Sequence, residues 1–307
     1  MRTISEIGLL HDVKDRLAFL LYRGFIAVFG ALPEPVMRRM GEGLGRLAWY
    51  VTRKRRRLVQ RHLRRVIGAD AEVHQKSKEM FASYGRYWAE VFWLRPDRKQ
   101  ELIAHSDIVN EEALQRSKAA GNGIILVLPH MGNWEVAGAV AESIGIPVLA
   151  AAENLPNPLI TDWFVKIRNM VGIDIVLIGR GLRATGDLIR RLKDGGTVAL
   201  LSDRDLSGRG VPVTFFGEST TMPAGPIALA DRTGAAIHVV GSYFKRGRGH
   251  RYVVADPLPL PGGESRDERI AGGVQVFAGE LEKMIRVAPQ DWHLFVPNWP
   301  SDREVTG

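Results

Sequence analysis

Four short aliphatic runs alternate with helical segments in the middle of the chain. They read IILVL at 124–128, PVLAA at 147–151, DIVLI at 174–178 and TVALL at 197–201. Continuous apolar runs of this length, separated by helices, are typical of parallel strands that are buried on both faces. Two later runs, AIHVVGSYF at 236–244 and RYVVA at 251–255, are separated by basic and glycine residues and predict an antiparallel pair.

Helical periodicity dominates the first 118 residues. The stretch EMFASYGRYWAEVFWL, 79–94, predicts an aromatic-rich amphipathic helix that ends before Pro96. Asn110 and Gly121 are typical start and stop residues of a further helix. A last helix is predicted from Glu268 to Val287.

These patterns predict an α/β fold with a mainly parallel central sheet flanked by helices. We expect residues 1–118 to form an N-terminal helical region of the same fold and residues 119–307 to form the α/β core. A chain of 307 residues is long enough to bury such a core.

The charge of the chain favours anionic partners. The formal net charge is +8 and the sequence pI is about 9.9. The segment RKRRRLVQRHLRR, 53–65, carries eight Arg or Lys residues and no acidic residue. Each such residue near an anionic membrane surface contributes about 1 kcal/mol. Nucleic acid would satisfy the same charge, but no recognition motif accompanies the run, so we expect no nucleic-acid partner.

An apolar stretch, LAFLLYRGFIAVFGAL at 17–32, precedes the basic run. It is shorter than the roughly 20 residues that span a bilayer. A buried core helix is one interpretation, and a helix that dips into one leaflet or borders an acyl-chain groove is the other. The basic neighbour favours the second, so we predict a membrane-associating N-terminal layer. The first residues, MRTISEIGLLHDVKDRL, lack the pattern of a signal peptide.

Candidate chemistry lies where the predicted strands end. In open α/β sheets the ligand crevice lies beyond the carboxyl ends of the strands. His130, Glu153, Arg180 and Asp203 follow four successive strands, and Arg204 and Asp205 come directly after Asp203. The sequence therefore predicts a site that combines a histidine, carboxylates and arginines.

The segment PHMGNWE, 129–135, is the centre of that site. A neutral His130 imidazole can take a proton from an attacking hydroxyl, and a carboxylate on its other ring nitrogen would fix the tautomer. The N–H groups beside Gly132 would lie near a helix start, where they could receive developing negative charge. The chain has no cysteine and no G-x-S-x-G elbow, so direct transfer is favoured over a covalent enzyme intermediate.

Two other interpretations of His130 and Glu135 are weaker. H-x4-E supplies at most two metal ligands and is not the H-E-x-x-H helix pattern. We therefore expect no metal site, although Asp203 and Asp205 could add ligands. The pair could also merely cap the following helix.

The chain resembles a family of bacterial acyltransferases that add fatty acyl chains to glycolipids. The family includes the lipid A enzymes and the phosphatidylinositol mannoside acyltransferases. The motif HMGNWE carries the resemblance first. It continues through ENLPNPLITDWFVKIRNMVG at 153–172, the segment 195–235, which includes SDRD, and EKMIRVAPQDWHLF at 282–295. The Asp203-Arg204-Asp205 sequence and the tail DWHLFVPNWPSDR resemble the mannoside branch.

The resemblance implies the reaction and its substrates. The donor would be acyl-CoA, often palmitoyl-CoA, used as a substrate with no cofactor, and the acceptor would be a mannose hydroxyl of a phosphatidylinositol mannoside. His130 matches the family's general base, and Glu135 and Asp203 are both candidates to orient it. Arg168 matches a recurrent arginine of the family and is expected to meet phosphate or the thioester region. Weaker candidates for phosphate contacts are Arg180, Arg183, Arg204, Arg209 and Arg232.

We therefore predict a membrane-associated acyltransferase, peripheral or monotopic, on the cytoplasmic face of the cell membrane. Its partners would be acyl-CoA, a glycolipid acceptor and the anionic inner membrane surface. The alternatives are a lipid A-type enzyme acting on another glycolipid and a non-catalytic protein that binds anionic lipid.

Overall fold

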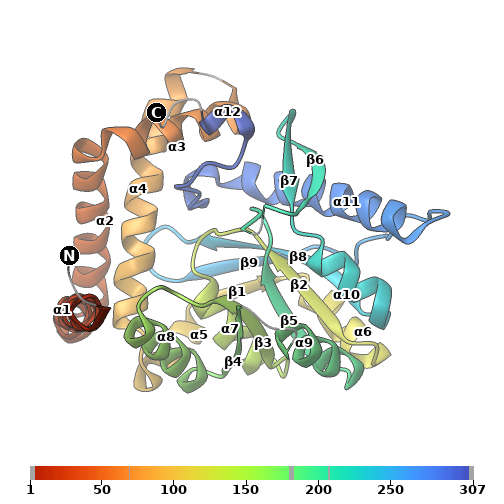
Figure 1. Ribbon diagram of the computed structural model, residues 1–307, viewed down its shortest axis with the longest axis horizontal. Coiled ribbons are helices and arrows are strands. Elements are labelled where there is room, and N and C mark those ends of the chain that lie inside the picture. The colour runs from red at the N-terminus through yellow and green to blue at the C-terminus, as the bar shows by residue number, and fades with distance from the viewer. Residues whose placement is uncertain (1–3, 69, 180–182, 207, 304–307) are drawn as a thin grey trace.

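The computed structural model describes residues 4–68, 70–179, 183–206 and 208–303. Its centre is a seven-stranded sheet with the strand order β1-β9-β8-β2-β5-β3-β4 (Figure 1). Every neighbouring pair is parallel except β8 and β9, which are antiparallel. The strands are β1 (Ser106–Val109), β2 (Ile124–Leu128), β3 (Val148–Glu153), β4 (Ile173–Ile178), β5 (Thr197–Leu201), β8 (Ala236–Phe244) and β9 (His250–Val254). The predicted α/β fold is confirmed.

Two parts of the strand prediction were incomplete. The short strand β1 lies in the region expected to be wholly helical, where it pairs with β9 at the sheet edge. The strands β6 (Val211–Phe215) and β7 (Glu218–Met222) form a separate antiparallel hairpin. Their sequences VPVTF and ESTTM combine apolar residues with proline and polar residues, and so they lack the aliphatic runs of the central strands.

The two faces of the sheet bury different cores because alternate strand residues point to opposite sides. On one face, Ile125, Val127 and Val198 pack with α9 (Arg183–Lys193), α10 (Gly225–Thr233) and α11 (Arg266–Val287). On the other face, Leu126 and Leu128 pack with α6 (Glu111–Ala120) and α7 (Trp134–Ser143). The remaining elements outside the N-terminal layer are α5 (Lys99–Ala104), α8 (Pro158–Met170), α12 (Pro300–Arg303) and the 3₁₀ turns Pro96–Arg98 and Pro289–Asp291.

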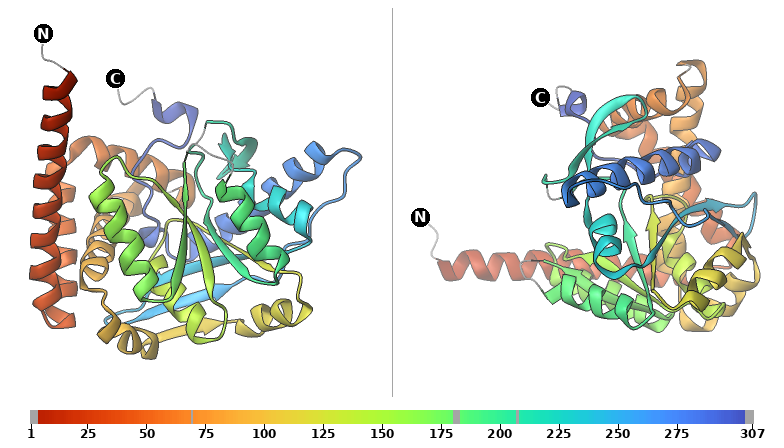
Figure 2. Two further views of the ribbon diagram at one scale, coloured as in Figure 1. Left: turned by 60° about the horizontal axis from the view of Figure 1, so that its bottom comes forward. Right: turned by 90° about the vertical axis from the view of Figure 1, so that its right-hand side faces the viewer.

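The N-terminal layer consists of α1 (Ile4–Ala31), α2 (Glu34–Val51), α3 (Arg53–Ile67) and α4 (Asp70–Trp93). A Cβ at Gly41 or Gly45 of α2 would overlap the backbone of α4, so these glycines permit close approach of the two helices. Helix α1 runs along one side of the molecule, and its N-terminal part extends beyond the body (Figure 2). Among the described helices, none is long and apolar enough to cross a membrane.

The basic run forms α3, and it is partly neutralised by residues from far along the chain. Arg61 and Arg65 pair with the buried Asp302, and Arg65 also pairs with Glu218. The side chains of Arg53, Lys54, Arg55 and Arg57 are exposed on the same helix. The exposed positive charge is therefore concentrated at the start of α3.

Candidate active site

His130 and Asp203 meet beyond the carboxyl ends of two neighbouring parallel strands. Leu128 of β2 is in register with Leu201 of β5, so the residue two positions after each strand lies at the same edge. The Nδ1 atom of His130 lies 2.6 Å from Oδ1 of Asp203, and the backbone N–H of His130 donates to Oδ2 at 3.1 Å. A carboxylate only accepts, so the proton lies on Nδ1 and Nε2 is left as the basic nitrogen.

Asp203 is fully buried, and its charge is balanced by its neighbours. Burial by itself raises the pKa of the Asp203 carboxyl, but His130 and the hydrogen bonds from His130 and Trp292 lower it below its usual value. The indole Nε1 of Trp292 donates to Oδ2 at 2.8 Å. Asp203 is therefore an ionised acceptor that faces the imidazole.

Glu135 has a different partner. It lies in the first turn of α7 and accepts two hydrogen bonds from Arg168 of α8, at 2.8 Å from Nε and 2.5 Å from Nη2. The Tyr87 hydroxyl lies 3.4 Å from the same carboxylate. Burial lowers the pKa of Arg168, but Glu135 more than offsets this, so the net shift is upward. Of the two candidate carboxylates, the structure places Asp203 against His130 and Glu135 against Arg168.

The turn after His130 is held by its own hydrogen bonds. Gly132 adopts φ 58°, a conformation that favours glycine. Its N–H donates to the Asp291 carbonyl at 2.9 Å, and the N–H of Asn133 donates to Ser242 Oγ at 3.0 Å. The N–H groups beside Gly132, expected to be available for developing negative charge, are therefore already engaged: that of Asn133 with Ser242, and that of Met131 with the Pro129 carbonyl at 2.8 Å. The Asn133 side chain caps α7 by accepting from the N–H groups of Glu135 and Val136.

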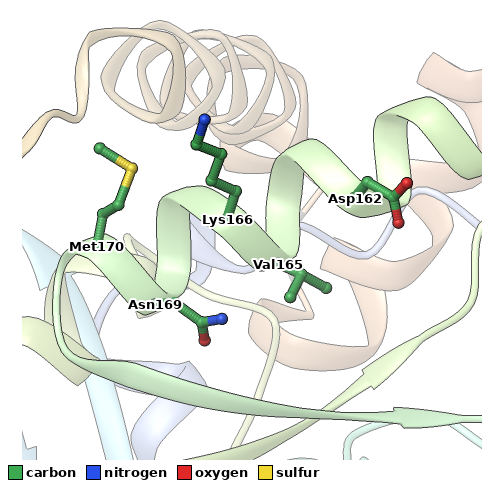
Figure 3. A pocket seen from close by; sticks show the side chains of 5 residues that line it. All are labelled: Asp162, Val165, Lys166, Asn169 and Met170. Carbon is green, nitrogen blue, oxygen red and sulfur yellow. The ribbon is translucent and has the colours of Figure 1, made fainter.

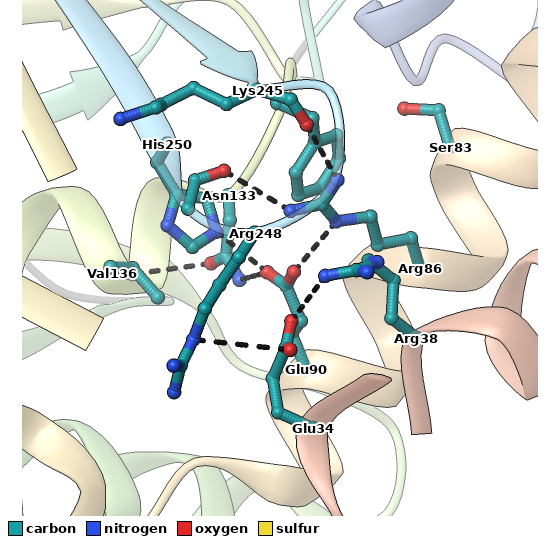
Figure 4. Close-up of polar contacts among 12 residues, drawn as sticks. Glu34, Arg38, Ser83, Arg86, Glu90, Asn133, Val136, Lys245, Arg248 and His250 are labelled. Carbon is teal, nitrogen blue, oxygen red and sulfur yellow. Dashed lines mark hydrogen bonds and ion pairs between the residues drawn. The ribbon is translucent and has the colours of Figure 1, made fainter. Parts of the chain in front are cut away.

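A buried polar network behind this turn links the N-terminal layer to the site (Figure 4). Glu90 of α4 accepts from Asn133 Nδ2 at 2.7 Å and contacts His250 Nε2 at 2.8 Å. Arg86, one turn earlier, donates to Glu90 at 2.8 Å and to the carbonyl of Gly249 at 3.1 Å. Burial raises the pKa of Glu90, but His250 and Arg86 bring it down to about 2. This network was not predicted, because its members are scattered along the sequence.

An apolar cavity of about 650 Å³ opens beside His130 and runs between the sheet and α7. Glu135, Glu153, Arg168 and Arg204 line it together with His130. Further into the strands and α7 the lining is aliphatic and includes Leu114, Leu126, Ala141, Ile144 and Val148. A five- or six-residue strand is roughly 17–20 Å long, which sets the reach of this space along the sheet. The cavity can hold an extended hydrocarbon chain with one end at His130.

A second hollow, of about 460 Å³, lies open along successive turns of α8 (Figure 3). Its lining consists of Asp162, Val165, Lys166, Asn169 and Met170, and Val165 also lines the apolar cavity. The two spaces therefore adjoin, and the open one carries both charged and polar side chains.

The predicted arginines are distributed unequally. Arg168 and Arg204 line the apolar cavity. Arg209 is exposed in the loop before β6, and Arg232 is exposed in the last turn of α10; neither is among the described residues that line the cavity. Arg180 and the side chain of Arg183 lie outside the described residues. Among those that are described, no group of three His, Cys, Asp or Glu side chains is arranged to hold a metal ion.

Comparison with known proteins adds independent information. The family described as bacterial lipid A biosynthesis acyltransferase matches residues 10–301. A phosphatidylinositol mannoside acyltransferase of Mycolicibacterium smegmatis is 34% identical over 248 residues, which is 80% of this chain and 79% of that protein. Its counterpart in Mycobacterium tuberculosis is 35% identical over 223 residues, 72% of this chain and 69% of that one. The lipid A biosynthesis lauroyltransferase of Escherichia coli is 27% identical over 269 residues, covering 85% and 84%.

Proposed function

Because the chain belongs to the bacterial lipid A biosynthesis acyltransferase family, and is thus an acyltransferase, we propose that it acylates a phosphatidylinositol mannoside. The acyl chain would come from acyl-CoA and pass to a mannose hydroxyl. The observation that carries the proposal is the His130–Asp203 pair at one end of an apolar cavity. The choice of acceptor rests on the two mannoside acyltransferases at 34% and 35% identity.

His130 acts as the general base of the transfer. Its Nε2 takes the proton of the acceptor hydroxyl as the oxygen attacks the thioester carbon. The new C–O bond forms, the C–S bond breaks, and the proton passes from the imidazolium to the leaving thiolate. Asp203 holds the Nδ1 proton in place and stabilises the imidazolium while it exists. The acyl group passes directly from the thioester to the acceptor hydroxyl, so no acyl-enzyme is required.

The apolar cavity takes the fatty acyl chain. Its lining beyond His130 is aliphatic, and burial of each methylene contributes about 0.8 kcal/mol. A palmitoyl chain is the donor implied by the family resemblance. The arrangement puts the thioester at the mouth, beside His130, and the hydrocarbon between the sheet and α7.

Basic side chains near His130 can meet the polar parts of the substrates. Arg168 and Arg204 line the cavity, where they pair with Glu135 and Glu153, and Lys166 lies in the adjoining hollow on α8. Arginine is well suited to phosphate because its planar donors bind two oxygens at once. We assign this region to the phosphates of the donor or of the inositol headgroup.

Helix α1 attaches the enzyme to the membrane surface in a peripheral or monotopic manner. Tyr22 and Phe29 of α1 pack inward, whereas Leu17, Leu20 and Leu21 are 57%, 58% and 70% exposed. The exposed apolar stripe on α1 suits insertion at a lipid surface, and the basic start of α3, at the other end of α2, adds positive charge to the same N-terminal layer (Figure 1). The cytoplasmic face of the cell membrane would supply both the acyl-CoA and that surface.

A panel of acyl-CoA donors crossed with glycolipid acceptors tests the proposal, with products identified by mass spectrometry and CoA release measured in parallel. We expect turnover with long-chain acyl-CoA and a phosphatidylinositol mannoside, and its loss in His130→Ala. Full activity of a folded His130→Ala variant would overturn the mechanism. Turnover only with another glycolipid would overturn the assigned acceptor, and lipid binding without any turnover would indicate a non-catalytic protein.

A further inference from the structure

The C-terminal segment after α11 closes over the strand ends that carry His130 and Asp203. The N–H of His293 donates to the carbonyl of His130 at 2.6 Å, and Met131 and Trp292 form an isolated β-bridge. Asn298 Nδ2 donates to the carbonyl of Asp203 at 3.2 Å. This segment therefore holds the backbones of both members of the pair.

Trp292 adds a contact to the reactive groups themselves. Its side chain is fully buried, and its Nε1–H donates to Asp203 Oδ2 at 2.8 Å. That oxygen also accepts the backbone N–H of His130, while Oδ1 faces Nδ1. The carboxylate thus accepts one hydrogen bond on Oδ1 and two on Oδ2. The three donors together define which oxygen faces the imidazole.

We propose that Trp292 is a positioning residue that acts through Asp203, so that the base is a His130–Asp203–Trp292 unit. The inference rests on the proposed function of His130. The indole N–H prevents rotation of the carboxylate and disperses part of its negative charge. Hydrogen bonds to ionised groups are roughly twice as strong as those between neutral groups, so the buried Trp292 N–H holds the Asp203 carboxylate firmly.

Trp299 provides a matched control in the same segment. It is 1% exposed, and its indole N–H donates to the Phe215 carbonyl at 3.2 Å, away from Asp203. Trp292→Phe and Trp299→Phe each remove one buried indole donor and a similar volume. Only the first variant removes a donor from the carboxylate that faces His130.

Other titratable groups surround the pair and must be considered in a pH profile. Next to Trp292 lie His293, whose pKa burial lowers to about 3, so that it remains neutral near pH 7, and Asp291, whose pKa burial raises to about 6. His62 of α3 packs against the Trp292 ring. From α7 and α8 come Glu135 and Arg168, which are paired with each other. Tyr84 and Tyr87 face the site from α4, and Arg204 follows Asp203. Neither tryptophan substitution removes any of these groups.

The test compares kcat, KM and the pH profile of acyl transfer in the two variants and in an Asp203→Asn background. We expect Trp292→Phe to lower kcat about 10- to 100-fold at nearly constant donor KM, as for loss of a hydrogen bond to a charged group. The acid limb should move to higher pH, because a carboxylate with one donor fewer favours the imidazolium more strongly. Trp299→Phe should leave the acid limb of the pH profile at the parent's pH. In the Asp203→Asn background, Trp292→Phe should lower kcat no further.

The indole N–H resonance of Trp292 offers a readout that does not depend on turnover. We expect it to shift in Asp203→Asn, while the resonance of Trp299 stays in place. The proposal would be overturned if the two tryptophan variants lost equal kcat, or if the acid limb of Trp292→Phe stayed at the parent's pH. It would also be overturned if the effects of Trp292→Phe and Asp203→Asn on kcat were additive. Full activity of His130→Ala would instead overturn the proposed function, so the two failures are distinguishable.

Discussion

The Nδ1 atom of His130 lies 2.6 Å from Asp203 Oδ1, although the two residues are 73 positions apart, whereas Glu135, five positions from His130, is bound to Arg168. A carboxylate beside the imidazole matters because it selects the tautomer that leaves Nε2 free to accept a proton. Asp203, distant in sequence, is therefore the carboxylate that contacts the imidazole, whereas Glu135, close in sequence, pairs with Arg168.

Asp203→Asn should lower kcat by about 1,000- to 10,000-fold, because an amide can present its NH₂ to Nδ1 and favour the wrong tautomer. CoA release at saturating donor measures this. Asp205→Asn is the control: that carboxylate is two residues away and accepts the N–H groups of Gly208 and Gly210 instead. A loss in Asp205→Asn equal to that in Asp203→Asn would contradict the assignment.

Much of this arrangement could be predicted from sequence because it depends on strand order along the chain. The runs IILVL and TVALL coincide with β2 and β5, and the residues that follow them do meet at one edge. The choice between Glu135 and Asp203 could not be predicted. It depends on the register of β2 with β5 and on the direction in which the first turn of α7 points, which places Glu135 toward α8.

Contacts made by distant segments were also beyond the sequence patterns. Trp292 approaches Asp203 from 89 positions away, and Glu90 approaches Asn133 from 43. A signal for Trp292 existed in the tail DWHLF, which lies within the family resemblance, but its partner follows only from the folded chain. Strand β1 was missed because SDIV is short and has only two apolar residues.

Arg168→Met should destabilise the fold by about 3–5 kcal/mol, because it leaves the Glu135 carboxylate buried without its partner. Urea unfolding at pH 7 measures the change. Adding Glu135→Gln should recover part of the loss, since the unpaired charge is then removed. If the losses in free energy of unfolding of Arg168→Met and Glu135→Gln simply added in the double variant, the two side chains would not act as a pair.

The far end of the apolar cavity should set the preferred acyl length. Ala141 and Leu114 line it at a distance from His130, near the end of α7 and on α6. Ala141→Leu should shift the preference to shorter chains and Leu114→Ala to longer ones, as measured by kcat/KM across a donor series. Both variants need thermal unfolding as a control, because core volume changes typically cost 1–5 kcal/mol. An unchanged ranking of donors in two folded variants would place the acyl chain elsewhere.

The exposed stripe on α1 should govern membrane binding. Replacing Leu17, Leu20 and Leu21 together with Gln should greatly weaken sedimentation with anionic vesicles while leaving the unfolding temperature nearly unchanged. A matched variant changes three exposed apolar residues elsewhere, Leu260, Val287 and Val296, and should bind as the parent does. Equal binding by the two triple variants would exclude α1 as the attachment surface.

Acid should destabilise the protein in stages, because two neighbouring buried groups titrate with opposite effects. Burial lowers the pKa of His293 to about 3, so the folded state keeps it neutral while the unfolded chain gains a proton as the pH falls through about 6.5. The contribution of His293 to the free energy of unfolding is therefore fully present above about pH 6.5. It is lost as the pH falls to about 3, by roughly 1.4 kcal/mol per pH unit at most.

Burial raises the pKa of Asp291 to about 6, which has the reverse effect between about pH 6 and 4, where the folded state binds the extra proton. We therefore expect the free energy of unfolding to fall from pH 7 to 6 and to stay nearly level to about pH 4. Below that pH it should drop steeply, where Glu90, with its pKa of about 2, also loses its contribution. Urea unfolding at each pH measures the profile. Asp291→Asn removes the opposing proton uptake and should convert the level region into a continuous decline, while an unbroken fall in the parent protein would contradict the assignment of these two groups.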